Sequence, residues 1–181
     1  MSAAAPTCII RECVAGDEEA LSLIGQATFL EAFAGTLRGI DILEHCRHKH
    51  SPELYRSWLA DARIDSWLAE VRQGAAAVGY LVMMGAGSAD LPLVDLNERD
   101  AEIRRIYLLP RFQGQGLGRA LMRAARERAQ QRGARRLVLG VYSGNHAAIG
   151  FYESEGFRRA GRRTFRVGQT DCEDLILVQA L

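Results

Sequence analysis

The chain has 181 residues, 48% of them hydrophobic and 25% charged, so it is long and apolar enough to bury the core of one globular domain. Its N-terminal segment lacks a charged region followed by an apolar run, and no apolar stretch approaches the length of a bilayer span, which argues against secretion and against a membrane protein. We therefore expect a single cytoplasmic domain over residues 1–181, with the four cysteines as free thiols.

The first half of the chain alternates strand-like and helix-like patterns. Acidic residues after Gly16 predict a helix start, and Ser51 followed by Pro52 predicts another, because a capping serine then precedes proline at the first helical position. We expect strands at 8–13, 66–71 and 76–84, helices at 15–33, around 40–45 and from 51, a hairpin turn at 72–74 and an acidic loop at 85–100.

The segment 102–119, EIRRIYLLPRFQGQGLGR, is typical of a strand, a turn, a glycine-rich loop and a helix start. Apolar and β-branched residues predict a buried strand at 102–109, and Pro110 ends it because proline has no amide hydrogen. The glycines within 113–118 let a ligand approach the backbone, and the helix that begins there leaves amides without intrahelical partners. Such amides lie at the positive end of a helix dipole, so the segment predicts a phosphate-binding loop.

The remainder of the chain continues the same alternation. A buried strand is expected at 136–142, and Asn145 opens a helix that Glu155-Gly156 closes as a C-cap. Two final strands are expected at 157–167 and 174–181. This order of elements predicts an α/β fold in which helices cover a mixed, twisted sheet.

The spacing of the glycines excludes two common phosphate-binding motifs. A P-loop requires Gly-Lys-Ser/Thr, which is absent, and a dinucleotide fingerprint counted from Gly114 requires a glycine where Arg119 stands. The remaining pattern, Gln-x-x-Gly-x-Gly directly after a strand, resembles the pyrophosphate-binding motif of the GNAT superfamily of N-acetyltransferases.

A second pattern supports the same resemblance. Asn145-x-x-Ala148, followed by Tyr152 and by Gly156-Phe157, is similar to the segment that follows the cofactor motif in GNAT enzymes. The resemblance implies the acyl-CoA N-acyltransferase fold: a mixed, mostly antiparallel sheet of about seven strands, with a splayed central strand pair and flanking helices. The stretches TFLEAF and FRVGQTDCEDLILVQAL further resemble the bacterial polyamine (spermine/spermidine) N-acetyltransferase branch.

The resemblance implies how acetyl-CoA, the co-substrate, lies on this chain. Its pantetheine arm runs along the central strand much as a peptide adds to an open sheet edge, and its pyrophosphate takes amides from the glycine loop. The cofactor-binding residues expected are Ile106, Tyr107, Leu108, Gln113, Gly114, Gln115, Gly116, Leu117, Gly118, Arg119, Asn145 and Tyr152. Asn145 is equally suited to a plain N-cap, and both roles can hold together.

The resemblance also implies the chemistry, which is direct attack of an amine on the thioester. Tyr152 is the expected general acid for the leaving thiolate, with a core aromatic as the alternative. Glu102 is the expected general base, because an amine arrives protonated and a catalytic glutamate holds the same place in histone-acetylating members. Deprotonation through water, with Glu102 merely salt-bridged to Arg104, is left open.

The acceptor side is expected to be acidic. The resemblance assigns substrate binding to Phe29, Glu31, Phe33 and Tyr142. If Glu31, the loop carboxylates and Glu102 ring the mouth opposite the cofactor, they would attract a polycationic amine such as spermidine. The loop carboxylates are Asp90, Asp95, Glu98 and Asp100.

Basic charge is nearly all arginine and concentrates between residues 104 and 166, so that the net charge of +1 hides an uneven distribution. Arg119 and Arg123 are expected near the phosphate site, where arginine binds phosphate in bidentate fashion. The other arginines of the following helix are expected to form a solvated face; they are Arg126, Arg128 and Arg132. No aromatic-basic interleaving accompanies them, which argues against a nucleic-acid partner.

A group of metal-ligating residue types lies before the third helix, at His45, Cys46, His48 and His50. No distant fourth ligand type joins them in the pattern, and His50 does not share a helix face with the first two histidines. We therefore expect solvated histidines and no metal.

The sequence leaves two other function classes open beside a small-molecule N-acetyltransferase. One is a GNAT-fold domain that binds or senses CoA without turnover. The other is an acetyltransferase acting on protein, peptide or RNA-linked amines, for which RNA binding would depend steeply on salt. The expected partners are acetyl-CoA and a small amine, without a membrane, and a homodimer is left open.

Overall fold

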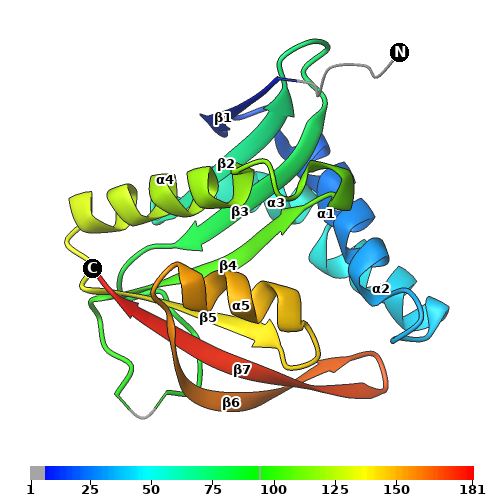
Figure 1. The fold of residues 1–181 in the computed structure, drawn as a ribbon. Helices are drawn as coiled ribbons and strands as arrows, with labels where there is room; N and C mark the ends of the chain where they lie inside the picture. The colour runs from blue at the N-terminus through cyan, green and yellow to red at the C-terminus, as the bar shows by residue number, and fades with distance from the viewer. Residues whose placement is uncertain (1–6, 94) are drawn as a thin grey trace.

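The computed structural model describes residues 7–93 and 95–181 and contains a seven-stranded sheet in the order β1-β2-β3-β4-β5-β7-β6 (Figure 1). Its strands are β1 (Cys8–Glu12), β2 (Ile64–Val71), β3 (Ala77–Met84), β4 (Asp100–Leu108), β5 (Arg136–Tyr142), β6 (Arg158–Val167) and β7 (Thr170–Ala180). Its helices are α1 (Glu18–Phe33), α2 (Gly39–Lys49), α3 (Pro52–Leu59), α4 (Leu117–Gln131) and α5 (His146–Ser154), with a short 3₁₀ turn η1 (Pro110–Phe112). Only the β4–β5 pairing is parallel, which confirms the mixed, mostly antiparallel sheet.

Helices cover both faces of the sheet. Helices α4 and α5 pack on one face, where Leu121 and Ile149 join the largest buried cluster (Figure 1). Helices α1 and α3 pack on the other face through Leu21 and Tyr55, both with no exposed surface. Burying these side chains is the main source of stability, because each large apolar side chain contributes about 1.5–3 kcal/mol.

The central strand pair separates along its length. Strand β4 pairs with β5 over only four residue pairs, from Asp100↔Arg136 to Ile103↔Leu139. Beyond this point β4 stays paired with β3 as far as Leu108, and β5 stays paired with β7. The two strands are therefore no longer paired with each other. We call the space between residues 104–108 of β4 and 140–142 of β5 the β4–β5 gap; it confirms the expected splayed pair.

A bulge in β4 lies where the gap begins. Val82 pairs with Arg105 and Met83 with Ile103, so Arg104 is the extra residue on β4. A bulge bends a strand and re-aims its side chains, and it is frequent beside active sites.

The closed end of the same strand pair is held by an ion pair. Arg136 donates from Nε and Nη2 to the two carboxylate oxygens of Asp100, at 2.8 and 2.6 Å, and from Nη1 to Asp95 at 2.6 Å. Asp100 is fully buried, so this bidentate pair joins the first residues of β4 and β5 away from solvent.

Most expected elements are present, with some shifted ends. Strand β7 begins four residues earlier than expected because it forms a tight hairpin with β6 around Gly168, and α2 extends to Lys49. The expectation of a solvated arginine face on α4 is wrong, because Arg128 and Arg132 pair with Asp65 and Arg126 pairs with Glu155. In the described part of the chain, no helix is both long and apolar enough to cross a membrane.

Candidate active site

The β4–β5 gap exposes main-chain groups of β4. Residues 104–108 pair with β3 on one side only, so their β5-facing amides and carbonyls have no strand partner. Ile106, Tyr107 and Leu108, the expected pantetheine contacts, lie in this stretch. An extended amide-containing arm can therefore bind there as an added strand would.

The glycine loop lies at the end of β4 and opens α4. Gly114 and Gly116 have φ of +73° and +82°, a left-handed conformation that a residue with a Cβ adopts only with strain. Gly116 is the N-cap of α4, and Ala120 is the first residue of the helix whose amide donates to the backbone, at Gly116. Among the described residues, the amides of 114–119 donate to no backbone carbonyl, so they are available to bind an anion.

The side chains of the loop play smaller parts. Gln113 and Gln115 fold back to donate to the carbonyls of Leu108 and Arg111, so they stabilise the loop itself. Gly118 is a packing requirement, since a Cβ there would lie 3.3 Å from the ring of Phe151. These contacts explain why the loop keeps its shape before α4 begins.

The two arginines expected near the phosphate lie in different surroundings. Arg119 is exposed at the loop and lies 3.3 Å from Glu155. Arg123 lines a surface hollow between β1 and α4 with Ile10 and Trp67, and its phosphate role stays a prediction.

Tyr152 lies on α5 against the large apolar cluster, only 7% exposed, with ring contacts to Phe151 and Phe157. Burial raises the pKa of its hydroxyl, and the nearby Tyr107 hydroxyl raises that pKa further, so the side chain is protonated at neutral pH. A protonated hydroxyl can act as a general acid. Asn145 caps α5 by accepting from the Ala148 amide at 3.0 Å.

Glu102 lies on β4, two residues before the bulge, and is 2% exposed. Its carboxylate accepts from the Asp90 amide at 2.9 Å and lies 3.1 Å from Nε of Arg104. Burial raises the pKa of Glu102, and the positive charges of Arg104 and Arg163 partly oppose that rise. A buried carboxylate with a raised pKa is suited to accept a proton near neutral pH.

Three of the four expected substrate residues gather on the face covered by α1 and α2. Phe29 and Phe33 have ring centroids 4.6 Å apart, and Phe33 lies 6.0 Å from Tyr142. Phe165 and the stacked ring of His45 complete this group, which we call the aromatic cluster. Glu31 lies on the exposed side of α1, so the structure does not bring it to the cluster.

The expected ring of acidic residues is not formed. Asp95 and Asp100 are held by Arg136 at the closed end of β4, while Glu98 is exposed on the loop. Only Glu102 and the Asp90 main chain lie together near the bulge. The loop carboxylates expected to attract a polycationic acceptor are therefore not gathered at one place.

The expectation of solvated histidines is wrong for two of them. His50 is 1% exposed, and its Nδ1 lies 3.0 Å from the Tyr55 hydroxyl, while His45 stacks on Phe29 with ring centroids 4.0 Å apart. Burial, aided by the charge of Arg105, lowers the pKa of His45 to about 4 and that of His50 to about 2. Within residues 7–93 and 95–181, no group of three or more His, Cys, Asp or Glu side chains is placed to hold a metal ion.

Sequence reasoning missed the basic side chains on the same face as the aromatic cluster. Arg105 donates to the Tyr55 hydroxyl at 2.7 Å and lies over the Trp58 ring, so it ties β4 to α3. Arg163 on β6 pairs with Asp174 on β7. The only signal for Arg163 was its place in an alternating strand, since alternate residues share a face.

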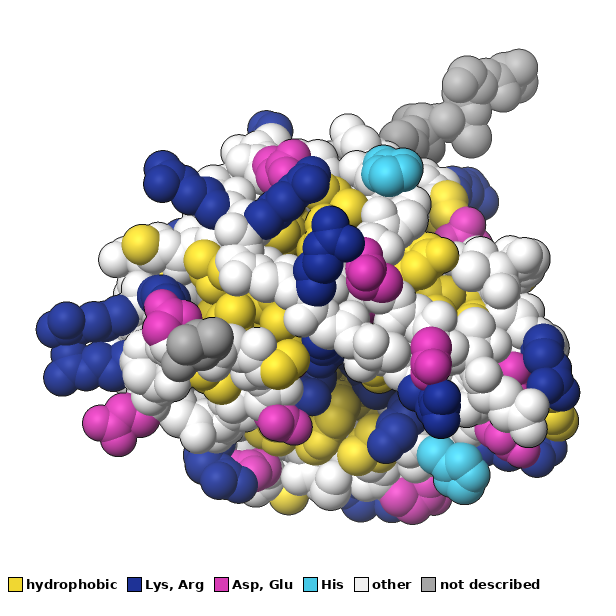
Figure 2. All heavy atoms as spheres, turned by 90° about the horizontal axis from the view of Figure 1, so that it is seen from below, with side chains coloured by type: hydrophobic (Ala, Val, Ile, Leu, Met, Phe, Trp, Pro, Cys, Tyr) yellow, Lys and Arg dark blue, Asp and Glu magenta, His cyan; other side chains and the backbone are white. Residues whose placement is uncertain are grey.

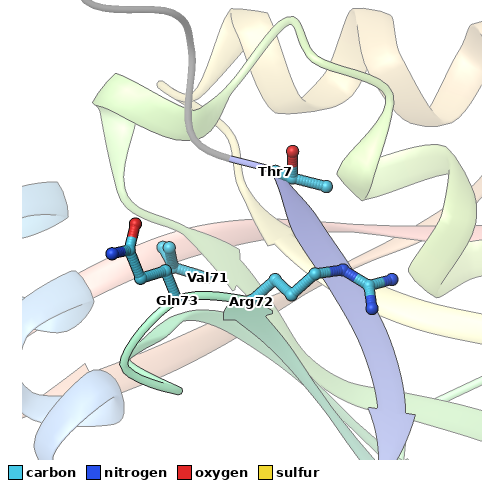
Figure 3. Close-up of a pocket in the computed structure, with 4 residues that line it drawn as sticks. All are labelled: Thr7, Val71, Arg72 and Gln73. Atoms are coloured by element: carbon cyan, nitrogen blue, oxygen red, sulfur yellow. The ribbon is translucent and has the colours of Figure 1, made fainter.

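Figures 2 and 3 show two hollows of the molecule. Figure 2, seen from the side that carries β6 and β7, shows a hollow with hydrophobic side chains inside and Lys or Arg side chains at its edge. Figure 3 shows a different hollow lined by Thr7, Val71, Arg72 and Gln73, at the β1–β2 side of the sheet and separated from β4 by β3. The latter contains none of the expected site residues.

Comparison with known proteins agrees with this geometry. The model of the Acetyltransferase (GNAT) family matches residues 27–157. The chain is 29% identical to an uncharacterised N-acetyltransferase of Mycobacterium tuberculosis over 91% of this chain and 98% of that protein. It is also 31% identical to the [ribosomal protein bS18]-alanine N-acetyltransferase of Escherichia coli, over 60% of this chain and 74% of that protein.

A solved structure supports the fold. The PaiA N-acetyltransferase of Thermoplasma acidophilum, crystallised in complex with coenzyme A, superposes with a TM-score of 0.73 at 19% identity, covering 97% of this chain and 99% of that one. The chain therefore belongs to the GNAT family of acetyltransferases. This class of enzyme transfers an acetyl group from acetyl-CoA, its co-substrate, to an amine.

Proposed function

We propose that this enzyme transfers the acetyl group of acetyl-CoA to the primary amine of a small molecule by direct attack. The observation that carries the proposal is the β4–β5 gap, which leads from the glycine loop to the bulge beside Glu102. An acyl-CoA bound along it has its pyrophosphate at the amides of 114–119 and its arm against residues 106–108. Its thioester then lies within the β4–β5 gap, between the face covered by α4 and α5 and the face covered by α1 and α3.

Two residues supply the proton transfers. Glu102 accepts one proton from the incoming ammonium, directly or through a water, and the free amine attacks the thioester carbonyl. A nitrogen–carbon bond forms and the carbon–sulfur bond breaks. Tyr152 gives its proton to the departing thiolate. The resulting tyrosinate then takes the second proton from the acetylated nitrogen.

Electrostatics and positioning support this assignment. Tyr152 and Glu102 are both buried, so charges that develop beside them interact strongly in a low-dielectric surrounding. Holding two reactants in one orientation supplies much of the acceleration of a group transfer. The chain needs no further cofactor for these steps.

The acceptor class has more than one candidate. The resemblance to polyamine acetyltransferases supports spermidine or spermine, but the carboxylates that would attract them are not gathered at the site. Similarity to a ribosomal-protein alanine acetyltransferase favours a peptide N-terminus as the second candidate. Both belong in the test.

Two measurements test the proposal. Calorimetric titration with acetyl-CoA should show one site, and release of free CoA should follow addition of a suitable amine from a panel of polyamines, amino acids, aminoglycosides and peptides. Failure to bind acetyl-CoA would refute the cofactor assignment. Binding with no CoA release for any amine would instead favour a CoA-binding domain without turnover.

A further inference from the structure

The guanidinium of Arg163 reaches from the edge strand β6 to the mouth of the β4–β5 gap. A Cβ built on Gly140 would lie 2.7 Å from Nη2 of Arg163 and 3.0 Å from its Cζ, so the guanidinium lies directly on this glycine. Gly140 is the residue after Leu139, the last β5 residue that pairs with β4. Arg163 therefore crosses β7 and places its charge where the two strands part.

Asp174 orients this arginine without using all of its donors. Nε and Nη2 of Arg163 lie 3.1 and 3.0 Å from Oδ2 of Asp174, a carboxylate on β7 that is 6% exposed. Nη1 of Arg163 donates to no group in residues 7–93 and 95–181, and the side chain is 22% exposed. The guanidinium is thus held by Asp174 through Nε and Nη2, and its Nη1 is available to donate to a ligand.

A second arginine lies at the same place. The β4 bulge presents Arg104, whose Nε lies 3.1 Å from the Glu102 carboxylate without forming a hydrogen bond. Its Nη1 and Nη2 also have no hydrogen-bond partner in the part of the chain that the structure describes. Arg104 and Arg163 both lie close enough to Glu102 to act on its ionisation, since their charges oppose the effect of burial on its pKa. Two arginines with unused donors therefore flank the proposed base.

The surroundings of Arg163 are apolar and aromatic. Its Cζ lies 5.4 Å from the centroid of Phe165, which belongs to the aromatic cluster with Phe29, Phe33 and Tyr142. His45 adds no charge there at neutral pH, because burial lowers its pKa to about 4. A ligand that fills this region meets an apolar surface beside free guanidinium donors.

We propose, on the basis of the N-acetyltransferase function above, that the acceptor is an amine that carries a carboxylate and an apolar side chain, and that Arg163 binds the carboxylate. The planar guanidinium suits two-pronged recognition of a carboxylate and opposes the entry of a polycation. Asp174 is a positioning residue that orients Arg163, and Arg104 provides the second positive charge. Apolar amino acids have this combination of groups.

The test uses pairs of acceptors in which an amide replaces the carboxylate, and rates are compared at equal concentrations of the free amine. CoA release is measured with L-phenylalanine against L-phenylalaninamide and with L-leucine against L-leucinamide, with spermidine as the polycation. We expect a preference of about 10- to 100-fold in kcat/KM for the carboxylate member, the range of a hydrogen bond to a charged group. Equal rates for acid and amide, or spermidine as the best acceptor, would overturn the proposal.

Two variants remove the guanidinium from the site in different ways. Arg163→Gln removes the charge, and Gly140→Ala keeps it but displaces it, because the added Cβ would occupy the place of the guanidinium. Both should abolish the preference, chiefly through KM. Arg162→Gln is the matched control, since Arg162 is the neighbouring residue of β6 and pairs with the exposed Glu173.

Acetyl-CoA titration of each variant separates this proposal from the proposed function. Normal acetyl-CoA affinity together with an unchanged acid preference in Arg163→Gln refutes the carboxylate site and leaves the acetyltransferase assignment standing. If no amine of the panel releases CoA, binding of 3-phenylpropanoate and of its amide to the protein with CoA is compared by NMR. Equal or absent binding of the two then refutes the carboxylate site.

Discussion

The proposed cofactor side and the proposed acceptor side of this enzyme are built in different ways. The cofactor side comes from one continuous segment, residues 104–119, with a contribution from α5, and it offers mainly backbone groups. The acceptor side is assembled from α1, α2, β4, β5, β6 and β7, and it offers side chains. The difference indicates that cofactor binding tolerates most substitutions except at glycines, whereas acceptor choice depends on a few individual side chains.

The largest expected effect concerns the tyrosine between the two sides. Tyr152→Phe keeps the ring packing against Phe157 and removes the hydroxyl, so single-turnover acetyl transfer should fall roughly 10²- to 10⁴-fold, the contribution of a general acid. Acetyl-CoA affinity should stay near the wild-type value. Tyr80→Phe is the matched control, because it removes a buried tyrosine hydroxyl from the apolar cluster under α1 and α3. An unaltered chemical rate in Tyr152→Phe would assign Tyr152 to packing alone.

Glu102 tests whether the acceptor side supplies the base. The group must be ionised to accept a proton, so activity should fall as pH falls through its pKa, which burial places above the ordinary glutamate value. Glu102→Gln should lose about a hundredfold in rate and lose this acidic limb of the pH profile. Glu98→Gln is a suitable control, because Glu98 is an exposed carboxylate on the preceding loop. An identical limb in both variants would point to another base.

A glycine substitution tests the backbone character of the cofactor side. Gly116→Val forces a β-branched residue into a left-handed conformation at the N-cap of α4, and acetyl-CoA affinity should fall by roughly tenfold or more. Gly133→Val carries the same strain at the other end of α4, with φ of +77°, far along the helix from the loop. Calorimetry should show weakened binding only for the first variant; equal loss in both would mean that strain acts through general stability.

The smallest effect concerns the histidine buried beneath the acceptor side. The pKa of His50 is lowered to about 2 by burial, whereas in the unfolded chain it lies near 6.5. The unfolded state therefore binds more protons below pH 6.5, and His50 should reduce stability by up to about 1.4 kcal/mol for each pH unit of acidification in that window. His50→Gln should flatten the pH dependence of the unfolding free energy, measured by chemical denaturation at a series of pH values in that window.

Sequence reasoning succeeded where the information is local. The glycine loop, the α5 cap at Asn145 and the order of strands follow from turn chemistry and periodicity within short segments, and the splayed pair followed from the family resemblance. It failed for the acidic loop, because the pairing of Asp95 and Asp100 with Arg136 depends on distant segments. Arg163 was missed for the same reason: its role depends on a glycine two strands away. Glu31 as a substrate contact stays a prediction.

The bidentate pair between Arg136 and Asp100 has a thermodynamic consequence for how the cofactor enters. The pair joins the first residues of the parallel β4–β5 ladder, and the bulge at Arg104 lies where this ladder of four residue pairs ends. The width of the β4–β5 gap is therefore determined when the chain folds. Acetyl-CoA then meets a preorganised surface and causes little strand rearrangement. Its association should follow a single kinetic phase whose rate rises linearly with concentration and shows no plateau from a slow opening step.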